Sequence, residues 1–255
     1  MFSTLRSAIL LILFFTISCA NQNPPSDENS DPIRILYVTG GGFHDYEAQA
    51  EAIREGLSER LPVEITVDHE AGESNSHQLS RHNDPNWHED FDAVIYNMCF
   101  ALVTDTEYIE SVTRPHYETG IAAIVLHCAM HTYRDADTEE WDRLLGLSTY
   151  HHERQQREFE ILPLNTDHPA MADFPEEGWV SPRDELYIVT GVFDNMTPLA
   201  QAWGPETEAH HVVMWANEYG EARVIGATAG HNTDVISDPV YMDFLANGLR
   251  WATRR

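Results

Sequence analysis

Basic residues are scarce in this chain of 255 residues. It has 15 Lys and Arg against 42 Asp and Glu, which gives a formal net charge of −27. This balance excludes a nucleic-acid-binding surface and docking on anionic lipid by charge, because both need clustered basic side chains. The charge does not bear on the fold.

Cysteine is also rare. The chain has three, Cys19, Cys99 and Cys128, too few for the disulfide-rich scaffold of a small secreted domain. Cys99 and Cys128 each follow a predicted strand. They can form a disulfide only if the two strands are neighbours, because the bond needs closely spaced Cα atoms. Their pairing is open at this point.

Common signature motifs are missing as well. Three glycines, Gly40 to Gly42, follow the first predicted strand, but their spacing is not the GxGxxG of a dinucleotide site. The sequence contains no HExxH or CxxC motif of a zinc protein and no internal repeat. The function must therefore be argued from residues that the fold brings together.

The amino-terminal segment predicts export. An apolar run, Ala8 to Phe15, is too short to span a bilayer and is typical of a signal peptide, here residues 1–18. The residues up to Cys19 resemble a bacterial lipobox, which implies cleavage before Cys19 and lipidation there. Residues 19–31 are polar and contain prolines, as a disordered tether does. We expect an exported protein of the cell envelope or periplasm, held at the membrane by lipid alone; ordinary secretion is the alternative.

Residues 32–255 are predicted to form one α/β domain. Apolar runs alternate with helical stretches, which predicts a mainly parallel central sheet with helices on both faces. The first, third and fourth strands are expected side by side. The expected strands are 33–39, 63–68, 91–98, 121–126, 157–162, 186–189, 199–203 and 212–216, the last paired with 223–228, and the main helices are 46–60, 104–119 and 239–251.

Histidines follow several of these strands. His44 comes after the first strand, His127 after the fourth and His231 after the last. Ligands of open α/β sheets bind beyond the carboxyl ends of the strands, so these side chains are candidates for chemistry at one site.

A divalent metal such as Zn²⁺ is one hypothesis for this site. Imidazole nitrogens are common zinc ligands, and His127, His131 and His152 are the candidate ligands. His127 and His131 would lie on one face of a helix that begins directly after the strand. His44 or His231 would lie near these ligands. In the alternative, the histidines only form hydrogen bonds and no metal binds.

Several short motifs extend over nearly the whole mature chain. They are Gly42-Phe43-His44-Asp45, Val125-Leu126-His127 with His131, Asp184-Glu185-Leu186-Tyr187, Tyr219-Gly220 leading through Arg223-Val224 to Gly230-His231, and Gly248 to Ala252. In order and spacing they resemble the ThuA-like (trehalose-utilisation) family. The resemblance implies a class I glutamine amidotransferase-like fold, a flavodoxin-like three-layer sandwich. It also implies carbohydrate metabolism, commonly alongside sugar oxidoreductases.

The resemblance places the candidate catalytic residues on the family's recurring polar positions: His44, His127, Glu185 and His231. We expect an enzyme that acts on a sugar or keto-sugar by proton transfer, isomerisation or glycosidic cleavage. The histidines would polarise a sugar oxygen, directly or through a metal, and Glu185 or Asp45 would move a proton. The residues expected to contact the substrate are Phe43, Asp45, His131 and Tyr187.

Two other functions stay open. A non-catalytic carbohydrate-binding lipoprotein would stack sugars on aromatic rings, and the candidates are Trp87, Tyr133, Tyr187 and Trp215. A Cys-dependent hydrolase would use Cys128 as nucleophile, because nearby imidazoles and a helix amino terminus lower a thiol pKa. The residues flanking Cys128 are not the small ones of a nucleophile elbow, which weighs against this hydrolase.

Overall fold

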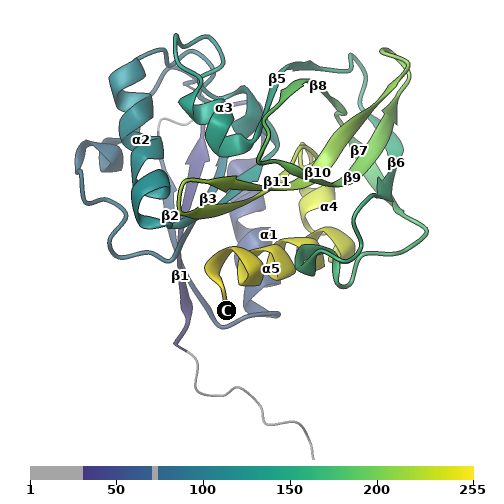
Figure 1. Ribbon diagram of the computed structural model, residues 1–255, viewed down its shortest axis with the longest axis horizontal. Coiled ribbons are helices and arrows are strands. Elements are labelled where there is room, and N and C mark those ends of the chain that lie inside the picture. The colour runs from purple at the N-terminus through teal and green to yellow at the C-terminus, as the bar shows by residue number, and fades with distance from the viewer. Residues whose placement is uncertain (1–30, 71–73) are drawn as a thin grey trace, which may run out of the picture. The chain divides into compact units, whose positions relative to one another are not determined.

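The central sheet has nine strands and is parallel in its first part (Figure 1). The computed structural model describes residues 31–70 and 74–255, which belong to one compact unit. The strand order is β2-β1-β3-β4-β11-β10-β9-β6-β7. The strands of the parallel part are β1 (Ile33–Gly40), β2 (Val63–His69), β3 (Ala93–Met98), β4 (Ala122–Leu126) and β11 (Ala222–Ala227).

The parallel part has the strand order of a flavodoxin-like sheet. β2, β1, β3, β4 and β11 pair in parallel in that order, with β1, β3 and β4 adjacent as predicted. β3 and β4 are buried along their whole length, because helices cover both faces of the sheet. The predicted α/β fold, a layered structure around a sheet with a parallel core, is confirmed.

The rest of the sheet is antiparallel. β10 pairs with β11 as the sequence predicts, and β9, β6 and β7 extend the sheet. β5 and β8 form a separate two-stranded sheet. The sequence pattern does not predict β5 or β7, since both are short and β7 contains Pro182. The bounds are β5 (Leu147–His152), β6 (Arg157–Pro163), β7 (Trp179–Asp184), β8 (Tyr187–Val192), β9 (Thr197–Gly204) and β10 (Ala209–Tyr219).

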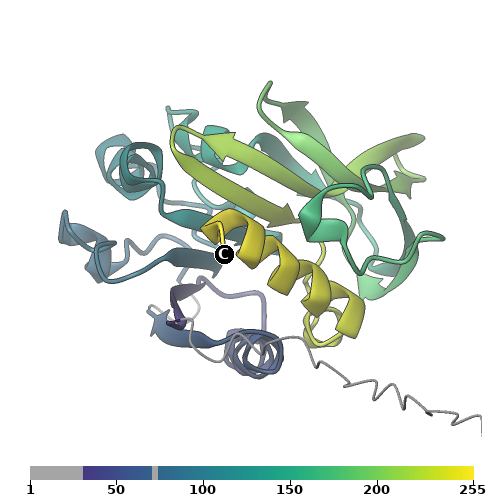
Figure 2. The ribbon, with the colours of Figure 1, turned by 60° about the horizontal axis from the view of Figure 1, so that its bottom comes forward.

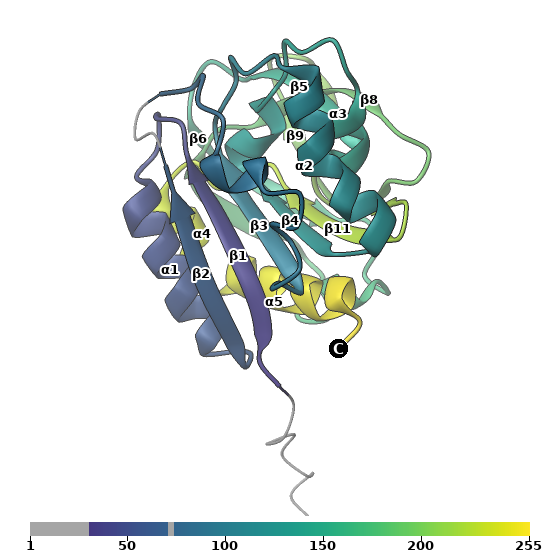
Figure 3. The same ribbon diagram turned by 90° about the vertical axis from the view of Figure 1, so that its left-hand side faces the viewer.

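Helices form a layer on each side of the sheet (Figure 3). α1 and α5 pack on one face and α2 and α3 on the other; Figure 2 shows α5 lying along its face. Alternate residues of β1 enter opposite cores, Ile35 and Tyr37 one, Leu36 and Val38 the other. The helices are α1 (Tyr46–Ser58), α2 (Thr106–Thr119), α3 (Glu140–Leu145), α4 (Thr233–Ile236) and α5 (Pro239–Thr253), with 3₁₀-helices η1 (Ser80–Asn83), η2 (His127–His131) and η3 (Pro169–Met171).

The amino-terminal predictions fall outside the described residues. These are the signal peptide of residues 1–18, lipidation at Cys19 and all but the last residue of the tether. Within the described parts of the chain, no helix combines the length and the apolar character needed to cross a membrane. Export and lipidation stay predictions.

Three of the four aromatic side chains expected to stack on a sugar lie in the core. Trp87, Tyr133 and Trp215 are 4%, 3% and 0% exposed. A buried ring packed on both faces offers no surface to a sugar, so the structure corrects this expectation. Only Tyr187 lies next to a cavity.

We expect Gly226→Ala to lower the free energy of unfolding by about 1–3 kcal/mol, the usual cost of overpacking a core. A Cβ atom at Gly226 would overlap the Trp215 ring, whose Nε1 donates a hydrogen bond to the Leu145 carbonyl and so keeps the ring in place. Gly191→Ala is the control, since its Cβ would meet the Ser148 hydroxyl, which can rotate. Urea unfolding compares the two variants; equal stabilities would show that the sheet adapts around the ring.

Candidate functional site

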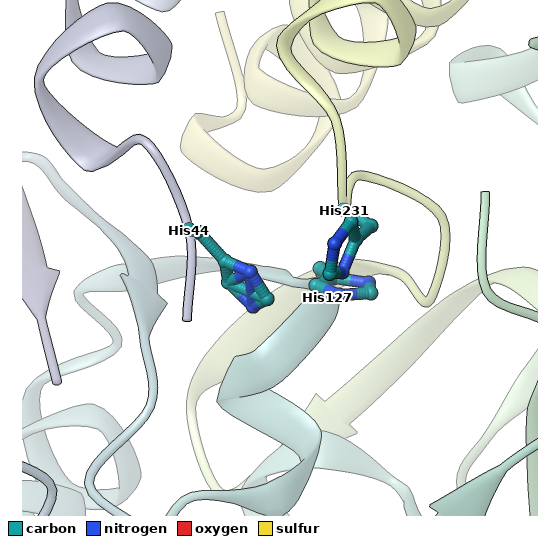
Figure 4. A group of neighbouring side chains, drawn as sticks. All are labelled: His44, His127 and His231. Atoms are coloured by element: carbon teal, nitrogen blue, oxygen red, sulfur yellow. The ribbon is translucent and has the colours of Figure 1, made fainter. Parts of the chain in front are cut away.

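Three histidines meet beyond the carboxyl ends of the parallel strands (Figure 4). His44 follows β1, His127 follows β4 and His231 follows β11, and these strands end at the same edge of the sheet. The ring centroid of His44 lies 4.8 Å from that of His127 and 4.7 Å from that of His231. One potential ligand atom of each histidine lies within 4.8 Å of the others. We call these residues the histidine triad.

A glycine-rich loop places His44 in the triad. Gly40, Gly41 and Gly42 have φ angles of 134°, 102° and 77°, which L side chains rarely adopt. A Cβ atom on Gly41 would lie 2.6 Å from the carbonyl of Cys99. The glycines therefore let the loop lie directly against the end of β3, and this close approach directs His44 inward.

The orientation of His127 is fixed by one hydrogen bond. Its ring is fully buried, and Nδ1 donates to the Thr228 carbonyl at 2.8 Å. Because a carbonyl can only accept, Nδ1 carries a proton, and in a ring with this single proton the lone pair would be on Nε2. Nε2 lies 3.5 Å from the Tyr187 hydroxyl. An outer partner of this kind typically orients a metal-binding histidine.

The carboxylate of Glu185 connects the histidines. Its Oε2 atom lies 3.1 Å from Nδ1 of His231 and 3.6 Å from Nε2 of both His127 and His152. Burial opposes ionisation of Glu185, but the neighbouring imidazoles of His127 and His231 favour its carboxylate form more strongly and hold its pKa well below the ordinary value. Glu185 is therefore a carboxylate over the whole physiological range.

His44 is the least satisfied member of the triad. Neither of its ring nitrogens has a hydrogen-bond partner among the described residues. Burial, with a smaller effect from His127 and His231, lowers its pKa to about 2, so the ring is neutral and has a free lone pair. Three imidazoles beside a carboxylate are a donor set that suits a divalent transition metal.

The ligand set expected from the sequence is not brought together. His127 belongs to the triad, but His131 and His152 form a stack with Tyr187, whose ring centroid lies 4.3 Å from that of His131 and 5.7 Å from that of His152. The reason is η2, because a 3₁₀-helix turns by about 120° per residue and puts positions four apart on different faces. The histidines that the structure brings together with His127 are His44 and His231.

His44, His231 and Glu185 line a cavity of about 290 Å³, close to the lower end of ligand-site volumes, and His127 is fully buried behind them. Tyr187 and His131 form part of its wall and Phe43, which is 70% exposed, stands at its mouth. Asp45 does not line the cavity; its side chain accepts a hydrogen bond from the N–H of Ala48 and caps α1. The cavity is lined by Phe43, His44, Asn75, Cys99, Ala101, Leu102, Cys128, His131, Arg134, His152, Glu185, Tyr187 and His231.

Several lining residues cannot be recognised from the sequence. Asn75, Leu102 and Arg134 carry no motif and come from loops, so only the fold reveals them. Asp184 belongs to the same motif as Glu185 and has no expected role, yet it holds the site together through hydrogen bonds from backbone N–H groups. A larger groove of about 890 Å³ lies elsewhere, between α2, α3 and the β10–β11 turn, and includes none of the triad.

Cys99 and Cys128 form a disulfide at the cavity wall. β3 and β4 are neighbouring parallel strands, so the residues that follow them reach the same edge. The pairing left open by the sequence is therefore present. With its sulfur bonded, Cys128 has no thiolate to offer, and the Cys-dependent hydrolase is not supported.

The ThuA family, described as trehalose utilisation, matches residues 34–252. The chain belongs to the ThuA family. This places it in carbohydrate metabolism and confirms the resemblance seen in the motifs. A comparison with curated proteins gave no match.

Solved structures of ThuA-like proteins share the fold. One from Parabacteroides merdae is 17% identical, with a TM-score of 0.67 over 88% of this chain and 90% of that one. Another from Bacteroides uniformis is 16% identical, with a TM-score of 0.65 over 90% and 95%. A β-galactosidase from Rahnella sp. R3 is 10% identical, with a TM-score of 0.53 over 85% of this chain and 31% of that one. At these identities the likeness concerns the fold alone.

We expect His44→Ala and His231→Ala to weaken divalent-metal binding by more than about 100-fold, because loss of an outer partner of a ligand alone costs about 10–100-fold. His131→Ala and His152→Ala are matched controls that leave the triad intact and should retain the metal. Elemental analysis before and after chelation, followed by calorimetric titration, measures the four affinities. Equal losses in all four variants would contradict the triad as the ligand set.

Proposed function

We propose that this ThuA protein catalyses proton transfer on a keto-sugar, next to a carbonyl that the triad polarises. The observation that carries the proposal is the contact of one carboxylate oxygen, Oε2 of Glu185, with three imidazoles beside a sugar-sized cavity. Membership of a trehalose-utilisation family supports a carbohydrate substrate. A sugar oxidoreductase is the class of enzyme that would supply a keto-sugar.

His44, His127 and His231 are the residues that would hold a divalent metal. Bound there, such a metal would supply Lewis acidity toward a carbonyl oxygen. The protein prepares this role by fixing Nδ1 of His127 on the Thr228 carbonyl and by keeping His44 neutral and without partners. The ring of Tyr187 packs beside His127, with centroids 4.8 Å apart, and limits its movement.

Glu185 is the proposed base. Its lowered pKa keeps it ionised and able to accept a proton, and a carbon next to a polarised carbonyl carries the kind of acidic C–H that a carboxylate can deprotonate. This acidity favours a keto-sugar over an unmodified sugar. His152 lies 3.6 Å from the same carboxylate oxygen and is partly exposed, so it can exchange the proton with solvent.

Glycosidic hydrolysis with two carboxylates is less well supported. Such a mechanism needs a second acid within about 5–10 Å of the first. Among the described residues that line the cavity, Glu185 is the one carboxylate, and Asp45 is engaged in capping α1. Bond cleavage would have to follow from proton abstraction at carbon.

We further propose that the protein works outside the cytoplasm, tethered by lipid at Cys19. The apolar segment before Cys19 supports export, and the Cys99–Cys128 disulfide is typical of an oxidising compartment.

We expect Cys19→Ala, introduced into the full-length chain, to release the protein from the membrane fraction, because stable attachment needs the lipid chains. Cell fractionation with immunoblotting measures the distribution, and Cys99→Ser is the control for loss of a cysteine elsewhere. Retention of the Cys19→Ala protein in membranes would contradict lipid anchoring.

We expect Glu185→Gln to lower kcat by about 10²–10⁴-fold, the usual contribution of a positioned acid or base, while substrate binding changes little. The assay follows deuterium incorporation next to the carbonyl of a keto-glycoside in deuterated water by NMR. Asp45→Asn is the matched control, since an asparagine caps a helix equally well and lies outside the cavity.

Two results would contradict the proposal. Glu185→Gln with an unchanged exchange rate would remove Glu185 as the base. A wild-type protein that binds keto-glycosides without incorporating deuterium, isomerising or cleaving them would instead be a carbohydrate-binding module.

A further inference from the structure

The disulfide of Cys99 and Cys128 lies next to His44, in the wall of the same cavity. Both cysteines are nearly buried, at 3% and 5% exposure, and Tyr46 packs against them. The proposed function uses neither sulfur. Their position at the carboxyl edge of the sheet therefore calls for a separate explanation.

The two sulfur atoms and His44 form a second set of potential metal ligands. One ring nitrogen of His44 and both Sγ atoms all lie within 4.8 Å of one another. His44 is thus common to this set and to the triad, and neither of its ring nitrogens has a hydrogen-bond partner in the described structure. No other residue of the triad belongs to the second set.

We propose that reduction of the disulfide creates a metal site made of Cys99, Cys128 and His44. Thiolates are soft ligands, so the site would take Zn²⁺ or Cu⁺ in preference to Mg²⁺ or Mn²⁺. With three protein ligands and the cavity on its open side, it leaves a fourth position for water or a substrate atom.

The geometry of the backbone allows this change. Tetrahedral zinc with the usual bond lengths needs sulfur atoms about 3.8 Å apart and a nitrogen about 3.5 Å from each. The Cα atoms of Cys99 and Cys128 are 5.0 Å apart, so side-chain rotation can separate the sulfurs without moving the strands. His44 already lies within reach of both.

The chemistry is a two-electron reduction. A phosphine breaks the S–S bond and is oxidised to the phosphine oxide. The oxygen of the phosphine oxide comes from one water molecule, whose two hydrogens form the two thiols. A protein dithiol can instead reduce the bond by thiol–disulfide exchange and is itself oxidised to a disulfide. Metal binding then releases the two thiol protons to solvent.

The two sites exclude each other. A neutral imidazole has one nitrogen lone pair, so His44 can bind a metal in the triad or between the sulfurs, but not in both. When the reduced cysteines and His44 hold a metal, His44 is therefore not available as a ligand in the triad. The redox state of Cys99 and Cys128 would decide where the metal is held.

The test is a Co²⁺ titration of the wild-type protein, once oxidised and once reduced under argon with a water-soluble phosphine. We expect a thiolate-to-cobalt charge-transfer band in the near ultraviolet for the reduced protein, absent from the oxidised one. The band should be lost in the Cys99→Ser and Cys128→Ser variants. Far-ultraviolet circular dichroism checks that both variants are folded. The comparison of oxidised with reduced wild-type protein tests the proposal even if a variant does not fold.

His127→Ala separates this inference from the proposed function. It removes a triad ligand but none of the second set, so the reduced variant should keep the charge-transfer band, while His44→Ala should lose it. A reduced wild-type protein that binds Co²⁺ without the band, or that binds none, would overturn the second site. Neither outcome bears on the role of Glu185, which the exchange assay tests in the oxidised protein.

Discussion

A buried carboxylate holds the site together. Asp184 is fully buried and accepts hydrogen bonds from the N–H groups of Glu185 and Gly230 at 2.7 Å and of His231 at 3.0 Å. Burial raises the pKa of Asp184. The nearby His127 and the three N–H donors act in the opposite direction and limit this rise. Removing the acceptor would leave three N–H donors unpaired, one of them in a buried contact and two in partly buried ones, which explains why the ends of β7 and β11 stay joined.

The first helix reaches the same segment from the other side. Gln49 of α1 donates to the carbonyls of Gly230 and His231 and accepts from Asn97 of β3, which also donates to Tyr37. The loop carrying His231 is thus fixed by Asp184 through its N–H groups and by Gln49 through its carbonyls. Such support on both sides keeps the triad rigid, which is what a site for metal or proton transfer needs.

The sequence predicts the parallel part of the fold well and the site only in part. The positions of His44, His127 and His231 follow from one rule, that parallel strands end at a common edge. The position of Glu185 does not follow from this rule. β7 is not predicted, and the chain reaches the site through long-range antiparallel pairing that periodicity does not reveal. The separation of His131 and His152 from His127 has a local cause: the spacing of His127 and His131 suits an α-helix, but the backbone forms a 3₁₀-helix there and then a separate sheet.

The charge of the chain bears on what the cavity can receive. A net charge of −27 produces a negative potential that raises the local concentration of divalent cations and repels anions. Inside the cavity, His44 and His131 are held neutral mainly by burial, so they add no positive charge to offset this field. Arg134 is the one arginine that lines the described cavity, and Glu185 opposes it with a permanent negative charge. Before a metal binds, a sugar phosphate that approaches the cavity would meet this negative field, whereas a divalent cation is attracted by it and an uncharged keto-sugar is not repelled.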